Sequence, residues 1–260
     1  MGQAALPSGR TTYPDLIRLD GQTQVVLGAG QGIGREAARA LSQAGATVVC
    51  VDVDSTRRAA VVRETDGIDI GADVTRRDDL RRVAREAKQA TGRLDGVIDV
   101  VGRALWKPLL ETDEDDVASQ FQVSFGHAVP VLQELADAFT AGGAVTFVTS
   151  LAAHSGAPGA ALYGAAKAGL VSLVRSAAVE LGPAGVRVNA VSPGYTRTAR
   201  SRPLPAAELA RRVGRVPLRR VGTAADIAAA LLYLQSGLAG FITGQVLVVD
   251  GGVSTRPTYE

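Results

Sequence analysis

The hydrophobic positions of this 260-residue chain fall into short runs separated by longer amphipathic segments. The runs predict strands at residues 24–27, 47–52, 68–72, 95–100, 144–149, 186–191 and 245–249. The segments between them predict helices at residues 33–44, 55–64, 77–91, 113–139, 161–181 and 224–235. Strands that alternate with helices form a parallel sheet covered on both faces. Right-handed crossovers then predict an α/β fold with a doubly wound, Rossmann-like, seven-stranded sheet.

The chain shows no linker, repeat or low-complexity tract, so one domain is the simplest organisation. Residues 1–15 contain two prolines and two glycines and predict a flexible arm before a single domain at 16–260. The least regular region is 194–223, which holds several prolines and one short helical segment near 206–213. A long excursion of this kind is typical of a lid over a substrate.

Composition narrows the class of protein. Hydrophobic residues make up 46% of the chain but aromatic residues only 4%, so small aliphatic side chains must build the core. A net charge of +2 without a clustered basic face argues against a nucleic-acid partner. One cysteine and two histidines make no metal cluster unless carboxylates dominate it, and we expect none. With no apolar run near the ~20 residues that span a membrane and no signal pattern, we expect a cytoplasmic protein without a membrane partner.

A glycine-rich turn follows the first predicted strand. Residues 28–34 read GAGQGIG, and a helix pattern follows at once. Gly28, Gly32 and Gly34 allow a tight turn that starts a helix beneath a pyrophosphate, where free N–H groups and a partial positive charge bind anions. Glycine turns are common, so the pattern predicts a dinucleotide site only because it has a strand before it and a helix after it.

Acidic residues at the ends of the next two strands extend this site. Asp52 ends the second strand, where a carboxylate accepts both adenosine ribose hydroxyls and repels a 2′-phosphate. We therefore expect NAD rather than NADP, although Arg57 and Arg58 stand close enough in sequence to bind a phosphate. Asp73 follows the third strand and has two equal interpretations: an acceptor for the adenine amino group, or a cap with Thr75 before the next helix.

A set of three residues in the second half of the chain is typical of a hydride-transfer enzyme. Tyr163 and Lys167 are four residues apart in a helix pattern and share one face, and Ser150 ends a predicted strand before them. A phenol with a pKa of about 10 is a poor base near neutrality, and an adjacent ammonium favours the phenolate. Each residue alone is more often a surface aromatic, a solvated charge or a strand-end cap. Their coincidence behind a dinucleotide signature favours catalysis.

Taken together, these residues resemble the short-chain dehydrogenase/reductase family over nearly the whole chain, from residue 19 to residue 252. The glycine motif, the Tyr-x-x-x-Lys motif, the preceding serine and a Pro-Gly turn after the sixth strand carry the resemblance. It implies catalytic roles for Ser150, Tyr163, Lys167 and Ser124. It implies a cofactor site of Gly28, Gln31, Gly32, Ile33, Gly34, Asp52, Asp73, Val74, Tyr163, Lys167, Pro193, Gly194, Thr196 and Thr198. The substrate pocket would include His154 and Tyr195.

Three positions depart from the family pattern. Leu27 replaces the threonine that ties the glycine loop to the next strand. Residues 99–102 read DVVG instead of NNAG, so the fourth strand loses its usual side-chain brace. Ser124 stands where the family has an asparagine that holds a water in a proton relay. The relay is therefore the part of the machinery most in question.

The prediction is an oxidoreductase that transfers a hydride between NAD(H) and a secondary alcohol or ketone, with Tyr163 as general acid and base. Two alternatives stay open: an NADPH-dependent reductase of 3-oxoacyl-type ketones, and a dinucleotide-binding regulatory protein with little catalysis. The helix pattern at 161–181 carries too many apolar positions for one buried stripe. The resemblance implies a homotetramer, with a dimer as the second choice.

Overall fold

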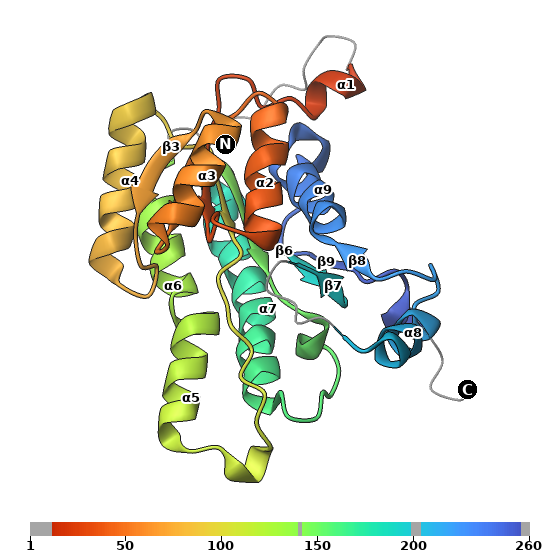
Figure 1. Cartoon of the computed structure of the whole chain (residues 1–260). Coiled ribbons are helices and arrows are strands. Elements are labelled where there is room, and N and C mark those ends of the chain that lie inside the picture. The colour runs from red at the N-terminus through yellow and green to blue at the C-terminus, as the bar shows by residue number, and fades with distance from the viewer. Residues whose placement is uncertain (1–11, 140–141, 199–203, 256–260) are drawn as a thin grey trace.

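The computed structural model describes residues 12–139, 142–198 and 204–255, which build a parallel sheet between two layers of helices (Figure 1). The strands follow the order β3-β2-β1-β4-β5-β6-β9. Their bounds are β1 (Thr23–Leu27), β2 (Thr47–Asp52), β3 (Ile68–Gly71), β4 (Gly96–Asp99), β5 (Gly143–Val148), β6 (Val186–Pro193) and β9 (Val246–Val249). The predicted doubly wound, seven-stranded sheet is confirmed. Its order reverses at β1 and β4, and ligands bind such sheets where this reversal opens a crevice at the carboxyl ends of the strands.

The helices cover the two faces as two separate cores. One core packs α2 (Gly32–Gln43), α3 (Ser55–Thr65) and α9 (Ala224–Gln235) on the sheet. The other packs α4 (Arg77–Thr91), α6 (Ala128–Val131) and α7 (Ala161–Leu181) on the opposite face. Successive residues of β1 alternate between them, since Val25 and Leu27 enter one core and Val26 the other. Both faces are buried, which explains the continuous apolar runs of the sequence.

The predicted helix at 113–139 is not one regular helix. It consists of α5 (Glu114–Phe121), a π-helical segment (Gln122–Gly126), α6 and a second π-helical segment (Leu132–Ala136). Pro130 supplies one physical reason, because it lacks the N–H that a regular helix would bond back to Gly126. π segments occur often at functional sites, and the first one here contains Ser124.

The irregular region at 194–223 has more structure than its sequence predicts. Strand β7 (Thr196–Arg197) pairs with β8 (Gly222–Thr223), and the chain between them carries α8 (Ala206–Arg215). Both ends of the excursion are therefore attached to each other beside the main sheet (Figure 1). Residues 199–203 lie outside the described residues, and the role of a lid stays a prediction.

The N-terminal arm was predicted to extend to residue 15, but a short helix, α1 (Tyr13–Leu16), begins within it. Residues 1–11 lie outside the described residues. Short 3-10 segments complete the chain: Leu109–Glu111, Leu151–Ala153, Gly182–Ala184, Gly237–Ala239 and Val253–Thr255. No helix among the described residues is both long and apolar enough to cross a bilayer.

Candidate active site

The glycine turn is built by backbone conformations that favour glycine. Gly28 and Gly32 have φ values of +84° and +57°, in the left-handed region. A Cβ on Gly34 would lie 2.0 Å from the carbonyl oxygen of Gly28, so α2 begins pressed against the turn. Gln31 precedes the helix in an extended conformation and adds no side-chain cap to it among the described contacts. The first N–H groups of α2, which contains Ile33, thus remain available for an anion.

The loop after β6 lies beside this turn. Pro193 ends the strand, and a Cβ on Gly194 would lie 2.6 Å from the Cβ of Asp250. The Thr196 hydroxyl donates a hydrogen bond to the carbonyl of Gly194 over 3.1 Å. Farther along, the Thr198 Cβ lies 3.4 Å from where a Cβ on Gly32 would stand. Two segments predicted to hold the cofactor, distant in sequence, therefore meet at the carboxyl edge of the sheet.

Asp52 faces the same turn. Its Oδ2 accepts a hydrogen bond from the amide of Gly30 over 2.9 Å, and its Oδ1 accepts one from the amide of Asp54 over 3.0 Å. A Cβ on Gly30 would lie 2.7 Å from Oδ2. Gly30 is thus required for the contact, a role that reasoning from the motif missed because the family pattern leaves this position variable.

The arginines near Asp52 are paired with carboxylates. The Nε of Arg57 lies 3.2 Å from Oδ2 of Asp54. Arg58 forms an ion pair with Asp69, and its Nη1 donates to the backbone carbonyl of Asp52 over 2.7 Å. The guanidinium groups that the sequence allowed as phosphate ligands therefore already have partners.

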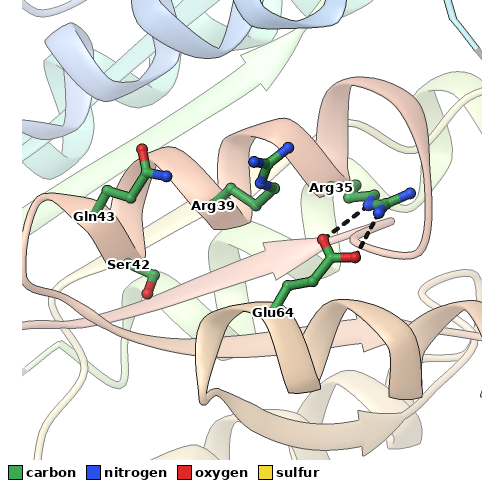
Figure 2. Close-up of a pocket in the computed structure, with 5 residues that line it drawn as sticks. All are labelled: Arg35, Arg39, Ser42, Gln43 and Glu64. Carbon is green, nitrogen blue, oxygen red and sulfur yellow. Dashed lines mark hydrogen bonds and ion pairs between the residues drawn. The ribbon is translucent and has the colours of Figure 1, made fainter.

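Arg35, the residue directly after the glycine turn, is paired as well. Its Nε donates to Oε2 of Glu64 over 3.0 Å, which joins α2 to α3 (Figure 2). The pair lines a polar pocket of about 290 Å³ together with Arg39, Ser42 and Gln43. None of these residues belongs to the predicted site, although Arg35 places one end of the pocket next to the glycine turn.

The structure gives Asp73 a local partner. Its Oδ1 accepts hydrogen bonds from the amide and the hydroxyl of Thr75, over 3.0 and 2.7 Å. The residue therefore stabilises its own turn, while α4 starts later with Arg76 as its N-cap. Val74, which stands between Asp73 and Thr75 in the sequence, is buried. Contact of Asp73 and Val74 with an adenine stays a prediction.

The three predicted catalytic residues come together where β5 and α7 meet. Ser150 is the second residue after β5, with Thr149 between them. Its Oγ accepts a hydrogen bond from the amide of Ala152 over 3.2 Å. Tyr163 lies in the first turn of α7. Burial raises the pKa of Tyr163, and a side-chain hydrogen bond with Ser150 acts in the opposite direction. The serine and the phenol thus already form a pair in the folded chain.

Lys167 lies one turn farther along α7 and is buried, with 3% of its surface exposed. Its Nζ donates to the carbonyl of Val148 over 2.8 Å and to that of Val101 over 3.4 Å. Burial lowers the pKa of Lys167 to about 8, and the charge of Asp99 acts against that shift. A Cβ on Gly102 would lie 2.9 Å from Nζ, so this glycine leaves the space that the ammonium occupies.

Ser124 is fully buried and bonded to its own chain. Its Oγ accepts a hydrogen bond from Nε2 of Gln120 over 2.7 Å and donates one to the carbonyl of Arg103 over 3.3 Å. Gln120 also donates to that carbonyl, over 2.9 Å. These bonds engage the Ser124 hydroxyl at the position where the family pattern has an asparagine that holds a water, and a relay role for Ser124 stays a prediction.

The two predicted pocket residues differ in environment. His154 is exposed just after the segment Leu151–Ala153. Tyr195 is half-buried, and the guanidinium carbon of Arg212 lies 4.4 Å from its ring centroid. This cation–π contact attaches α8 to the Pro-Gly turn. Helix α8 therefore lies against Tyr195, one of the two residues predicted to contact substrate.

Comparison with known proteins defines the class. A family profile described as enoyl-(acyl carrier protein) reductase matches residues 28–254. Together with the relatives below, this match shows that the chain belongs to the short-chain dehydrogenase/reductase family. Members of this family bind a nicotinamide dinucleotide, and the chain is an oxidoreductase that acts on CH–OH groups.

Several relatives cover nearly the whole chain. It is 30% identical over 244 residues to the 3-oxoacyl-(acyl-carrier-protein) reductase FabG of Thermotoga maritima, which covers 91% of this chain and 99% of that one. It is 31% identical over 247 residues to the 7alpha-hydroxysteroid dehydrogenase of Escherichia coli K12, covering 92% and 96%. A solved 7alpha-hydroxysteroid dehydrogenase in complex with NADH and 7-oxo glycochenodeoxycholic acid superposes with a TM-score of 0.88 at 30% identity, covering 93% and 98%.

Proposed function

We propose that this chain transfers a hydride between NAD(H) and a secondary alcohol or ketone, with Tyr163 as the general acid and base. The observation that carries the proposal is that Ser150 lies close enough to Tyr163 to lower the pKa of its phenol, while the buried Lys167 stands one helical turn away on α7. This group stands at the carboxyl ends of β4 and β5, the edge of the sheet that also carries the glycine turn.

The residues of the glycine turn fit a dinucleotide. The left-handed glycines and the open N-terminus of α2 suit a pyrophosphate, with Thr198 beside them. Asp52 suits a ribose diol, because two backbone amides orient its carboxylate toward the turn. When bound, the nicotinamide ring accepts or supplies the hydride.

The side chains of this chain would move the proton. In the oxidation direction, the Tyr163 phenolate takes the proton of the alcohol hydroxyl while the Ser150 hydroxyl donates a hydrogen bond to the same substrate oxygen. In reduction, the phenol returns that proton to the ketone oxygen. Burial disfavours a phenolate on Tyr163, so the reaction needs a positive charge nearby. Lys167, the cation one turn along α7, supplies it in this proposal.

The proposal is tested by supplying NAD or NADP with a panel of secondary alcohols, which includes hydroxysteroids, cyclic hydroxy acids and 3-hydroxyacyl thioesters. Turnover of at least one member, followed by formation of the reduced cofactor, is the expected result. Tight binding of the cofactor with no turnover of any member would instead favour the regulatory alternative, which is consistent with the two hydrogen bonds that hold Ser124 to its own chain.

The preference for NAD rests on Asp52 and on the pairing of Arg35, Arg57 and Arg58 with carboxylates. We predict that Asp52→Asn lowers the ratio of kcat/KM for NAD over NADP by about tenfold or more, because it removes a charge that repels a 2′-phosphate; tenfold corresponds to about 1.4 kcal/mol. Steady-state kinetics with both cofactors measure the ratio.

Asp66→Asn is the matched control, since Asp66 is an exposed residue after α3 and its loss removes the same charge elsewhere. Its ratio should stay at the wild-type value. A wild-type enzyme that prefers NADPH strongly would end the NAD assignment and favour the alternative of a 3-oxoacyl-type reductase.

A homotetramer, with a dimer second, remains the proposed assembly. Large apolar side chains are exposed near the end of α7 and around β9, namely Val179, Phe241, Leu247 and Val248. Helices α5 and α7 also lie side by side (Figure 1). Sedimentation velocity would give the assembly directly, and a monomer at micromolar concentration would contradict it. The cytoplasmic location stays a prediction.

A further inference from the structure

A buried acid–histidine pair lies beside the proposed catalytic group, in positions that the sequence pattern did not connect. Nε2 of His127 and Oδ2 of Asp99 are 2.8 Å apart, and each side chain is 1% exposed. Asp99 ends β4 in the middle of the sheet, in register with Leu27 and Phe147 on the two neighbouring strands. His127 follows the first π-helical segment. The pair therefore joins the helical layer to the sheet at the carboxyl end of the strands.

The contacts of the Asp99–His127 pair indicate which ring nitrogen of His127 carries the proton. Oδ1 of Asp99 accepts a hydrogen bond from the amide of Val101 over 2.9 Å, and Oδ2 faces Nε2 of the imidazole. Nδ1 of His127 is buried and has no hydrogen-bond partner in the described part of the chain. A proton on Nδ1 would thus be a buried donor without an acceptor, which is costly. The geometry favours a neutral imidazole that donates from Nε2 to an ionised carboxylate.

One short turn connects this carboxylate to Lys167. The amide of Val101 donates to Asp99, and the carbonyl of the same residue accepts from Nζ of Lys167. Gly102 then leaves the space for the ammonium. The negative and the positive group are held by opposite ends of one residue's backbone, and both side chains are buried.

Few other charges act on the ammonium. The titratable or charged side chains on the elements packed against Lys167 are Tyr163, Arg103, His154, the Lys107–Asp116 ion pair and exposed acidic residues at the start of α5. Arg187 lies at the opposite end of β6 and bonds to carbonyls after α9. Among the described residues, Asp99 is the carboxylate whose charge acts on Lys167.

We propose that Asp99, ionised and oriented by His127, keeps the buried Lys167 ammonium protonated, so that Asp99 and His127 are positioning residues of the site. The inference rests on the proposed function for its meaning in catalysis, but the protonation of Lys167 can be measured without it. An asparagine at residue 99, as in the family pattern, carries no charge and could not do this. In this proposal Asp99 supplies the negative charge, and His127 orients the carboxylate that carries it.

The chain is well suited to a direct test by NMR. Lys88, Lys107 and Lys167 are its only lysines, and His127 and His154 its only histidines. Protein labelled with ¹³C at the lysine Cε and with ¹⁵N in the imidazoles can be titrated without cofactor. We expect Lys167 to titrate near pH 8 in the wild type, well below the ordinary pKa of a lysine. We expect His127 to carry its proton on Nε2.

The decisive variant is Asp99→Asn, which keeps the shape of the side chain and removes its charge. Its Lys167 midpoint should fall by about one pH unit or more, because an opposite charge at close range shifts a pKa by about 1–3 units. Lys88 and Lys107 should not move and serve as internal controls. An Asp99→Asn protein whose Lys167 titrates as in the wild type would overturn the inference.

Variants of His127 test its part. His127→Leu leaves the buried carboxylate without its hydrogen-bond partner. Asp99 is then no longer oriented, so its charge should act less on Lys167, and the Lys167 midpoint should fall toward that of Asp99→Asn. His127→Gln keeps an amide donor and should restore most of the wild-type value. If His127 had only a structural role, the folded His127→Leu and His127→Gln proteins would have the same Lys167 midpoint.

The wild-type spectrum keeps the inference falsifiable if these variants do not fold. A His127 that carries its proton on Nδ1, or is an imidazolium at pH 7, would cancel or misdirect the charge on Asp99 and overturn it. The failure of the proposed function looks different: Lys167 and His127 would behave as expected while no member of the alcohol panel is turned over.

Discussion

Replacing Tyr163 by phenylalanine should lower kcat for alcohol oxidation by about 10²–10⁴-fold, the contribution typical of a positioned general acid or base. The substitution removes only the phenol hydroxyl, the group on whose pKa Ser150 acts. The ring remains to fill its half-buried position in the first turn of α7. Affinity for NAD, measured by fluorescence titration, should change little, because the turn, Asp52 and Lys167 are untouched. The loss therefore falls on the proton transfer.

The pH dependence of alcohol oxidation gives a second test of the role of Tyr163. Burial raises the pKa of Tyr163, so wild-type oxidation should increase with pH as the phenolate forms. The residual activity of Tyr163→Phe should lack that increase. Tyr233→Phe, which changes a half-buried tyrosine on α9, is the matched control and should keep the wild-type rate. Unchanged turnover in Tyr163→Phe would remove this residue from the mechanism.

The second large effect is expected at the glycine turn. In Gly34→Ala the new Cβ would stand 2.0 Å from the carbonyl oxygen of Gly28 and 2.8 Å from its carbonyl carbon. Both atoms belong to the backbone, so α2 and the turn must move apart. Forcing extra atoms into such a contact costs about 1–3 kcal/mol or more of unfolding free energy. Affinity for NAD should fall by at least about tenfold, since the same turn is proposed to hold the pyrophosphate.

Gly214→Ala separates this effect from the general consequence of replacing a glycine. Gly214 lies in α8, and no neighbouring atom would come within 4 Å of its new Cβ. Alanine is a better helix former than glycine by up to about 1 kcal/mol, so this variant should be as stable as the wild type or slightly more so. Urea unfolding and NAD titration compare the two. Equal stability and equal affinity in both variants would contradict the assigned role of the turn.

Much of the site could be read from the sequence because its signals are local. The glycine turn, the acidic strand end and the four-residue spacing of Tyr163 and Lys167 each lie within one strand–turn–helix unit or one helix. Local backbone geometry therefore dictates them. The seven strands could be placed for the same reason, since a strand buried on both faces must be apolar throughout.

Other features could not be predicted, because they depend on contacts between distant segments. The Asp99–His127 bond joins residues 28 positions apart, and periodicity does not record it. The contact of Asp52 with Gly30 uses a position that the glycine motif leaves variable. The break of the helix near Ser124 follows from Pro130 within a pattern that otherwise favours a regular helix.

The sequence by itself determined the class of fold, the order of its elements and the types of residue that the proposed chemistry needs. These follow from the spacing of apolar residues, the conformations open to glycine and the spacing of residues along a helix. Each of these acts over only a few residues of the chain. Only the tertiary structure decided which of those residues meet. It placed Thr198 against Gly32, gave the nearby arginines their carboxylate partners and set a buried carboxylate behind Lys167. Such pairings arise when the sheet aligns the ends of its strands, and the burial that follows makes each charge depend on its neighbour.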